Sequence, residues 1–320
     1  MAVTDTTVLA DVVRQAWERT SYFALRPELY FDLCAEVKPT RQSQPGSPVT
    51  FTIYSDLAVA TTALNEITDE TPASMGDTQV SVTLVEYGNS IVTTAKLRGL
   101  AFLPVDVDAA NLLGFNAGKS QDTLARDPLL AGTNVRYGGA ATSRVTVAAT
   151  HVIDADDVRR ILADMRDSNV MAYPNGYYKA FIAPDVSYDL RRETGAAAWR
   201  DPHTYSQPGE SWRGEIGAFE GFAFIETSRL GEGELPAGFV NGGVGGVVDV
   251  YPTVFVGRQA LAKTFSSAVS AANPQIGIGP VVDVHRRKHT VEWYWLGGYG
   301  RFREAAIWRL ESASSIGANV

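Results

Sequence analysis

The sequence predicts an α+β protein, with a few helices, several short strands and one extended two-stranded arm. Alternating apolar and polar side chains mark strands at Val49–Tyr54 and Gln79–Glu86. Apolar residues at helical spacing are clearest in the segment 154–168, and a β-rich block occupies residues 281–314. Together these patterns indicate mixed helix and sheet rather than an all-α or all-β protein.

Bulk composition excludes several classes of protein. At 320 residues the chain can bury a sizeable core and is long enough to divide into subdomains. The net charge of −8 argues against a dedicated nucleic-acid binder, which usually carries a basic face. Cys34 is the only cysteine, so no intramolecular disulfide can form, which suits a reducing cytoplasm. With neither a signal peptide nor an apolar run of about 18 residues, we expect a soluble intracellular protein.

The N-terminal segment has the pattern of an amphipathic helix. Thr4 or Asp5 can cap it, and an apolar stripe runs from Val8 to Trp17. The segment 19–36 behind it is rich in aromatic residues and is expected to be irregular, and a turn-rich break follows at 39–48. Such an arm can dock on its own body or on a neighbouring molecule.

The segment 49–94 has the pattern of a long hairpin. Its strands, 49–54 and 79–86, are separated by a polar excursion, and Tyr87-Gly88-Asn89 interrupts the run before a second β-rich piece at 91–94. Limbs of fifteen to twenty residues would reach roughly 50–65 Å at about 3.3 Å per residue. Because an isolated two-stranded hairpin is marginal in water, we expect this arm to lie on another surface.

The remaining elements follow from periodicity and turn signals. We expect a helix from about Asp106 to Leu124 despite the cost of Gly114 and Gly118. A second helix begins at Asp154 and turns Val158, Ile161, Leu162 and Met165 toward the core. The other predictions are a loop at 128–144, strands at 177–184, 219–227 and 250–257, short helices at 185–193 and 257–265, and a glycine-rich loop at 231–249.

Catalytic motifs are missing. Gly114 and Gly118 enclose only three residues, one fewer than a phosphate-binding loop needs. His285 and His289 are expected on one exposed basic strand, about 13 Å apart and too distant to share a metal. Cys34, between two apolar residues, has the setting of a small core side chain. We therefore expect neither an enzyme nor a cofactor, although catalytic groups scattered along the chain remain an open alternative.

The order of elements resembles a known family. The combination of a helical arm, a long two-stranded loop, a spine helix, a central domain and a β-rich return is similar to the major capsid proteins of tailed bacteriophages, with the Hong Kong 97-type fold. The likeness is greatest to the N4-like branch common in phages of actinobacteria. The segments that carry the resemblance are 62–72 (TALNEITDETP), 85–97, 178–193, 214–229, 250–261 and 305–314.

This resemblance implies a domain plan and a function. The implied regions are an N-terminal arm (1–44), an extension loop (45–95), a spine helix with a peripheral domain (96–170), an axial domain (171–280), and return strands with a C-terminal tail (281–320). The implied function is a coat protein that assembles in the host cytoplasm, as hexamers and pentamers, into the icosahedral shell of the virion around double-stranded DNA. DNA would be held without sequence-specific binding, and no cofactor or membrane is implied. The other implied partners are a separate scaffolding protein, a portal and a decoration protein.

Candidate contact residues lie at the loop tip, on the arm and on one helix. Acidic side chains at the tip could pair with arginines of a neighbouring subunit, or else remain solvated. Aromatic side chains of the arm could pack on a neighbour, or else within their own chain. The candidates are Glu66, Asp69 and Glu70 with Arg159 and Arg160, the arm residues Trp17, Tyr22 and Phe23, and Tyr87 at the end of the returning strand.

One departure from the family concerns covalent linkage between subunits. Some capsids of this fold join a lysine of the extension loop to an asparagine of the next subunit. Between Lys38 and Lys96 this chain has no lysine, so we expect no such bond from the loop tip. The alternative function left open is the shell of an encapsulin-like nanocompartment, which packages enzymes instead of DNA.

Overall fold

The computed structural model of the 320-residue chain describes residues 30–40, 48–61, 63–64, 66–67, 71–101, 105–193, 215–267, 270–279, 283–285 and 287–316. Within these ranges the chain forms two compact units. The first takes its described residues from Asn89–Asn116 and Ile276–Trp293, and the second from Pro27–Gly88, Ala117–Gln275 and Tyr294–Val320. The expected N-terminal helix lies outside the described residues.

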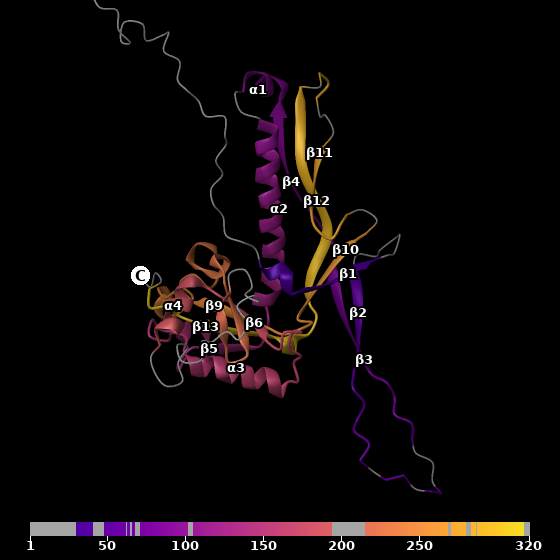
Figure 1. Ribbon diagram of the computed structural model, residues 1–320, viewed down its shortest axis with the longest axis vertical. Helices are drawn as coiled ribbons and strands as arrows, with labels where there is room; N and C mark the ends of the chain where they lie inside the picture. Colours follow the sequence, from indigo (N-terminus) through magenta and orange to yellow (C-terminus); the bar gives the residue numbers. More distant parts are fainter. Residues whose placement is uncertain are drawn as a thin grey trace, which may run out of the picture. The chain divides into compact units, whose positions relative to one another are not determined.

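A six-stranded mixed sheet is the centre of the second unit (Figure 1). Its strand order is β5-β13-β9-β6-β8-β7. The pairs β6–β8 and β13–β5 are parallel, and the other pairs are antiparallel. The strands are β5 (Val135–Tyr137), β6 (Tyr178–Ile182), β7 (Glu215–Phe219), β8 (Phe222–Glu226), β9 (Tyr251–Val256) and β13 (Ile307–Ser312).

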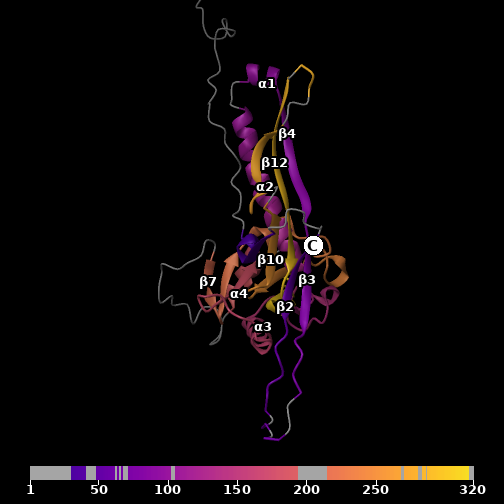
Figure 2. The same cartoon turned by 90° about the vertical axis from the view of Figure 1, so that its right-hand side faces the viewer.

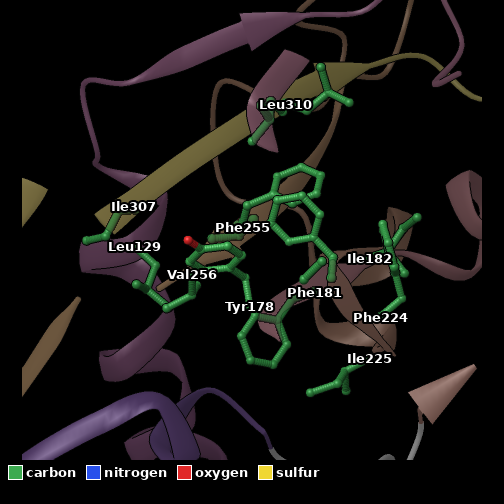
Figure 3. Close-up of a cluster of buried hydrophobic side chains, with 14 of the residues drawn as sticks. Leu129, Tyr178, Phe181, Ile182, Phe224, Ile225, Phe255, Val256, Ile307 and Leu310 are labelled. Atoms are coloured by element: carbon green, nitrogen blue, oxygen red, sulfur yellow. The ribbon is translucent and has the colours of Figure 1, made fainter. Parts of the chain in front are cut away.

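The core of this unit is built on β6 and β9, every residue of which is buried. A strand covered on both faces has a continuous apolar sequence rather than an alternating one. Phe181, Phe224 and Phe255 gather here (Figure 3). The ring centroids of Phe222 and Phe255 lie 4.7 Å apart in an edge-to-face arrangement, which is favourable for aromatic pairs.

Helix α3 (Ala155–Asp167) covers this core as the sequence predicts. Asp154 caps it, accepting a hydrogen bond from the backbone N–H of Asp157 at 2.8 Å. Burial, together with the nearby carboxylate of Asp154, raises the pKa of Asp157 to about 6. The apolar stripe predicted to face the core does so, and the short helix expected after residue 184 is α4 (Pro184–Arg192), which starts with a proline in its first turn.

Helix α2 (Val105–Leu130) is longer than the sequence predicts. The expected end near Leu124 is wrong because Ala125 and Leu129 are fully buried in the core, and this packing outweighs Pro128 in the last turn. The predicted loop 128–144 is also wrong in part, since Val135–Tyr137 pairs with β13. At Gly114, a side-chain Cβ would lie 3.1 Å from Cδ1 of Ile276, so the glycine makes room for that side chain.

A second sheet has the strand order β1-β10-β12-β11, and β4 also pairs with β12. Two predictions are wrong here. The segment 257–265 is not a helix, because β10 pairs with β1 on one side and β12 on the other, and the segment 19–36 is not wholly irregular, because it runs into β1. The strands are β1 (Ala35–Thr40), β4 (Val85–Thr94), β10 (Leu261–Ser266), β11 (Gln275–Gly279) and β12 (Lys288–Arg301).

Three strand predictions need correction. The single strand expected at 219–227 is a hairpin, with Glu220 (φ 47°) and Gly221 (φ 81°) forming the turn between β7 and β8. The strand expected at 79–86 is divided at Leu84, after which β4 continues through Tyr87-Gly88-Asn89 instead of being interrupted there. His289 lies in β12 as expected, whereas His285 lies in the turn before it.

The remaining described elements are short. Helix α1 (Ala95–Leu100) is capped by the side chain of Thr94, and sequence reasoning did not predict it. The 3-10 turns are η2 (Phe31–Cys34), η3 (Arg144–Thr146), η5 (Ser228–Leu230), η6 (Glu232–Glu234), η7 (Val244–Gly246) and η8 (Glu304–Ala306). Cys34 is buried, as expected of a core side chain.

Candidate assembly surface

The base of the predicted hairpin is a regular two-stranded ribbon. Strand β2 (Pro48–Tyr54) pairs antiparallel with β3 (Asp77–Thr83), in a register that places Phe51 opposite Val80 and Val49 opposite Val82. This confirms the strands expected on the two sides of the polar excursion. The paired limbs are seven residues long, shorter than the fifteen to twenty expected.

One face of this ribbon packs against the rest of the second unit, to which the ribbon itself belongs. Phe51 and Val82 are buried together with Ala262, and the Phe51 ring meets that of Phe302 edge-on, with centroids 5.8 Å apart. Gly300 allows this close approach, because a Cβ at that position would lie 2.6 Å from Cγ2 of Val82. The base of the hairpin is therefore stabilised by its own chain.

The tip of the hairpin differs sharply from its base. None of the described residues between Tyr54 and Asp77 lies in a helix or strand (Figures 1 and 2). A backbone hydrogen bond from Ser55 N–H to the Gly76 carbonyl, at 2.9 Å, closes the ribbon. Beyond this bond large apolar side chains are exposed: Leu57, Val59 (84% exposed), Leu64 (77%), Ile67 and Met75. We call Leu57, Val59, Leu64 and Met75 the apolar tip residues.

These exposures have a physical meaning. Fully burying a Val, Leu or Met side chain contributes roughly 1.5–3 kcal/mol relative to leaving it in water. A loop that gathers several such side chains without covering them is typical of an interaction surface. The described part of the protomer does not cover them.

The predicted contact residues other than Tyr87 fall into three groups. Glu66 is exposed at the tip, and its contact with another subunit stays a prediction. Arg159 Nε instead lies 3.0 Å from Glu220 Oε1, and Arg160 Nη2 lies 2.6 Å from Asp156 Oδ2, so both arginines have partners within their own chain. The candidates that lie outside the described residues are Trp17, Tyr22, Phe23, Asp69 and Glu70.

Tyr87 packs inside its own chain in this protomer. Its ring stacks on Trp295 with centroids 6.0 Å apart, and burial raises the pKa of its hydroxyl. The side chain remains half-buried, so a contact of its outer face with another subunit stays a prediction.

Sequence reasoning missed a buried ionic network. Asp122 on α2 and Arg229 in η5 are each about 1% exposed, and Arg229 Nε lies 3.4 Å from Asp122 Oδ2. Arg229 Nη1 also donates to Glu234 Oε2 at 2.8 Å, and its Nη2 donates to the Thr123 hydroxyl. The second oxygen of Asp122 accepts the backbone N–H of Phe31 at 2.8 Å. The network therefore joins α2, the turn before β1 and the loop after β8.

Burial dominates the electrostatics of this network. Desolvation raises the pKa of Asp122, while the Phe31 N–H and the Arg229 guanidinium oppose that rise. The only sequence feature that points to the network is the position of Asp122, which follows Gln121 and precedes Ala125 by three residues. This places the carboxylate near the apolar stripe of a helix. Its partner is 107 residues away along the chain, and no spacing rule reaches so far.

A second ion pair, between the buried Lys263 and the partly exposed Asp32, holds the same turn. Lys263 Nζ on β10 lies 2.9 Å from Asp32 Oδ1 and 3.1 Å from the amide oxygen of Asn273. Tyr299 on β12 donates its hydroxyl to Asp32 as well. The polar groups of η2 are thus tied to the strands that carry the hairpin base.

The described residues form neither a metal centre nor a membrane span. In that part of the chain, no group of three or more His, Cys, Asp or Glu side chains is placed to hold a metal ion. Among the same residues, no helix is long and apolar enough to cross a membrane.

Comparison with known proteins defines the class. The family of phage capsid proteins matches residues 9–316, and the chain belongs to that family. It is accordingly a bacteriophage major capsid protein, a structural component of the virion and not an enzyme. No curated protein matches the chain.

Solved capsid structures share the fold at low identity. The capsid protein of Ralstonia phage GP4 is 15% identical, with a TM-score of 0.74 and 98% of each chain covered. That of cyanophage Pam1 is also 15% identical, with a TM-score of 0.73, and 98% of this chain and 100% of that chain are covered. The acid-stable capsid of Helicobacter pylori bacteriophage KHP30 gives 12% identity and a TM-score of 0.68 over 98% of each chain.

Proposed function

We propose that this chain self-assembles, as hexamers and pentamers, into an icosahedral shell that encloses double-stranded phage DNA. The observation that carries the proposal is the contrast within one hairpin. Its base is buried against its own unit through Phe51 and Val82, while its tip exposes apolar side chains that the described protomer leaves uncovered. In a shell, a neighbouring copy is always present at high local concentration to cover them.

The proposal includes the Hong Kong 97-type organisation and its domain plan. In it, residues 1–44 form the arm, 45–95 the extension loop, 96–170 the spine helix and peripheral domain, 171–280 the axial domain, and 281–320 the return strands and tail. The resemblance to the N4-like branch and the long helix α2 support this assignment. Within it, Glu66, Asp69 and Glu70 at the loop tip and Trp17, Tyr22 and Phe23 on the arm face a neighbouring subunit.

The surroundings of the shell belong to the same proposal. Assembly takes place in the host cytoplasm, with a separate scaffolding protein, a portal and a decoration protein. The net charge of −8 suits a shell that does not grip its DNA, because tight phosphate binding needs basic residues. Packaged DNA is then held without sequence-specific contacts.

Electron microscopy tests this function directly. We expect the protein, expressed with its scaffolding protein, to form closed shells of uniform size, and particles from phage lysates to contain nuclease-protected double-stranded DNA. Particles that contain a co-purified enzyme in place of DNA would instead identify a nanocompartment shell. A protein that remains a monomer or small oligomer under all these conditions would contradict assembly altogether.

Heated particles are expected to release intact single protomers on a denaturing gel. The segment between Lys38 and Lys96 contains no lysine, so the loop tip cannot supply the amine for an isopeptide bond. The measurement is the band pattern of particles boiled in detergent, with unassembled protein as the reference lane. A ladder of cross-linked oligomers that resists reducing agent would contradict this expectation.

A further inference from the structure

Asparagine is followed directly by glycine at two places in the chain, Asn175-Gly176 and Asn241-Gly242. Asn175 lies in the turn that leads into β6, and Asn241 lies in the glycine-rich loop before β9. Both asparagines are exposed, so water reaches both side chains. The two pairs consist of the same residue types and differ in how the fold holds them.

Such a pair can close a ring on itself. The backbone nitrogen of glycine gives up its proton and attacks Cγ of the asparagine, so that an N–Cγ bond forms, the Cγ–Nδ2 bond breaks and the side-chain amide leaves as ammonia. Water then opens the five-membered succinimide at either carbonyl, which leaves aspartate or isoaspartate. Glycine favours the closure because it has no Cβ to obstruct the approach and its backbone rotates freely. The reaction consumes one water and needs no oxidant or cofactor.

The side chain of Asn175 is folded back over its own backbone. Its Oδ1 accepts the backbone N–H of Tyr177 at 3.2 Å, which is an Asx-turn. Because the Gly176 nitrogen lies between the two bonded groups along the chain, this bond carries Cγ of Asn175 toward that nitrogen. Gly176 has a φ of 82°, and within the described part of the chain no atom beyond its immediate neighbours lies within 4 Å of the place a Cβ would take. The space needed for ring closure is therefore open.

Two backbone hydrogen bonds close this turn. The N–H of Gly176 donates to the Tyr173 carbonyl at 2.8 Å, and the N–H of Tyr173 donates to the Tyr177 carbonyl at 3.1 Å. The first of these bonds has to open before the Gly176 nitrogen can attack. Residues 174–177 are all exposed, and an exposed turn opens locally at a low cost in free energy.

The backbone around Asn241 is held much more firmly. Asn241 has a φ of 51°, and its N–H donates to Asp249 Oδ1 at 2.6 Å. At Gly242, a Cβ would lie 2.6 Å from the Gly238 carbonyl oxygen, and the N–H of Gly242 donates to the Phe239 carbonyl at 3.1 Å. Ring closure requires the peptide between Asn241 and Gly242 to rotate, and these contacts resist that rotation.

From these observations we infer that Asn175 is a site of spontaneous deamidation in the folded protein and that Asn241 is protected by its backbone contacts. The modification turns an exposed amide into a carboxylate and adds one negative charge just before β6. In its isoaspartate form it also adds one carbon to the backbone between Tyr173 and Tyr177, which the present hydrogen bonds of the turn do not accommodate. The inference does not depend on the proposed shell function.

Mass spectrometry of the full-length protein tests this site. The folded protein is incubated at neutral pH in water enriched in heavy oxygen and then digested, so that each deamidation during the incubation is marked by one heavy oxygen atom. The same protein in urea is the reference, because unfolding gives both pairs the same freedom, and both are expected to convert there at similar rates. In the folded protein Asn175 is expected to convert at least about tenfold faster than Asn241, which corresponds to about 1.4 kcal/mol in activation free energy.

Asn175→Gln is the matched variant, since the extra methylene lengthens the ring that would have to form. It is expected to remove the heavy-oxygen label from the peptide that contains position 175 and to leave the conversion of Asn241 unchanged. Conversion of Asn241 as fast as that of Asn175 in the folded protein would overturn the inference. So would a folded Asn175 that stays intact while the urea reference converts, or a label in the same peptide that persists in Asn175→Gln.

Discussion

Replacing Arg229 with alanine is expected to lower the free energy of unfolding of the protomer by about 3–5 kcal/mol. The reason is that removing the guanidinium leaves the buried carboxylate of Asp122 without its charged partner. Arg229 and Asp122 are each about 1% exposed, so water cannot replace the lost guanidinium. Urea denaturation of the unassembled protomer, followed by tryptophan fluorescence, measures the change.

A matched control comes from the protein surface. Arg191 is half-exposed and its Nη2 lies 3.7 Å from Glu226 Oε2, so Arg191→Ala is expected to cost less than about 1 kcal/mol. The double variant Asp122→Asn with Arg229→Ala also removes the unpaired carboxylate, so it should recover part of the lost free energy of unfolding. Equal effects of the Arg229 and Arg191 substitutions would contradict a structural role for the buried network.

The Arg229→Ala defect should also depend on pH. Burial raises the pKa of Asp122 above its ordinary value, and loss of the guanidinium removes one of the influences that oppose that rise. A carboxylate with a raised pKa in the folded state destabilises the fold when ionised, and protonation relieves that cost as pH falls toward the raised pKa. The stability deficit of the variant relative to the parent should therefore shrink between neutral and mildly acidic pH.

Replacing the apolar tip residues Leu57, Val59, Leu64 and Met75 by serine is expected to abolish particle formation. Each loses roughly 1.5–3 kcal/mol of burial at every subunit contact, and about 1.4 kcal/mol already changes an association constant tenfold. These side chains are exposed in the protomer, so its thermal unfolding should hardly change. Sedimentation velocity and electron microscopy measure the loss of particles.

The control for this variant changes polar residues of the same loop. Thr61→Ser and Ser74→Ala leave the apolar side chains in place and are expected to assemble like the parent protein. Normal assembly of the four-serine variant would mean that the tip contributes nothing to the shell.

Local patterns predicted the elements whose stability is local. Helix α3 was correct in its cap and in its buried stripe, because Asp154 and the apolar residues behind it lie within a few turns. In the hairpin, the strand at 49–54 was correct and the strand at 79–86 was correct as far as Thr83, because the alternation of apolar and polar residues indicates one buried face. Such elements can be predicted from the local sequence without knowing which distant residues they contact.

Elements that depend on distant partners were missed. The segment that forms β10 has no decisive local pattern, and it becomes a strand because β1 and β12 pair with its two edges. Helix α2 continues past the expected end because Leu129 is buried by residues far away in sequence. The pair of Asp122 and Arg229 was missed for the same reason, since its members lie far apart in sequence. The partners of Arg159 and Arg160 within their own chain were not predicted either.

The candidate site was predicted in outline only. The sequence indicated a hairpin that needs another surface, and among the described residues it is the tip of the hairpin that stays uncovered. Hydrogen exchange of the protomer and of the assembled particle distinguishes the two halves directly. We predict fast exchange in the protomer for amides of residues 55–61 and 71–75, strong protection of the same amides in the particle, and protection of β2 and β3 in both. Amides of the tip that are already protected in the isolated protomer, or that stay unprotected in the particle, would contradict the idea that this loop is ordered by a second subunit.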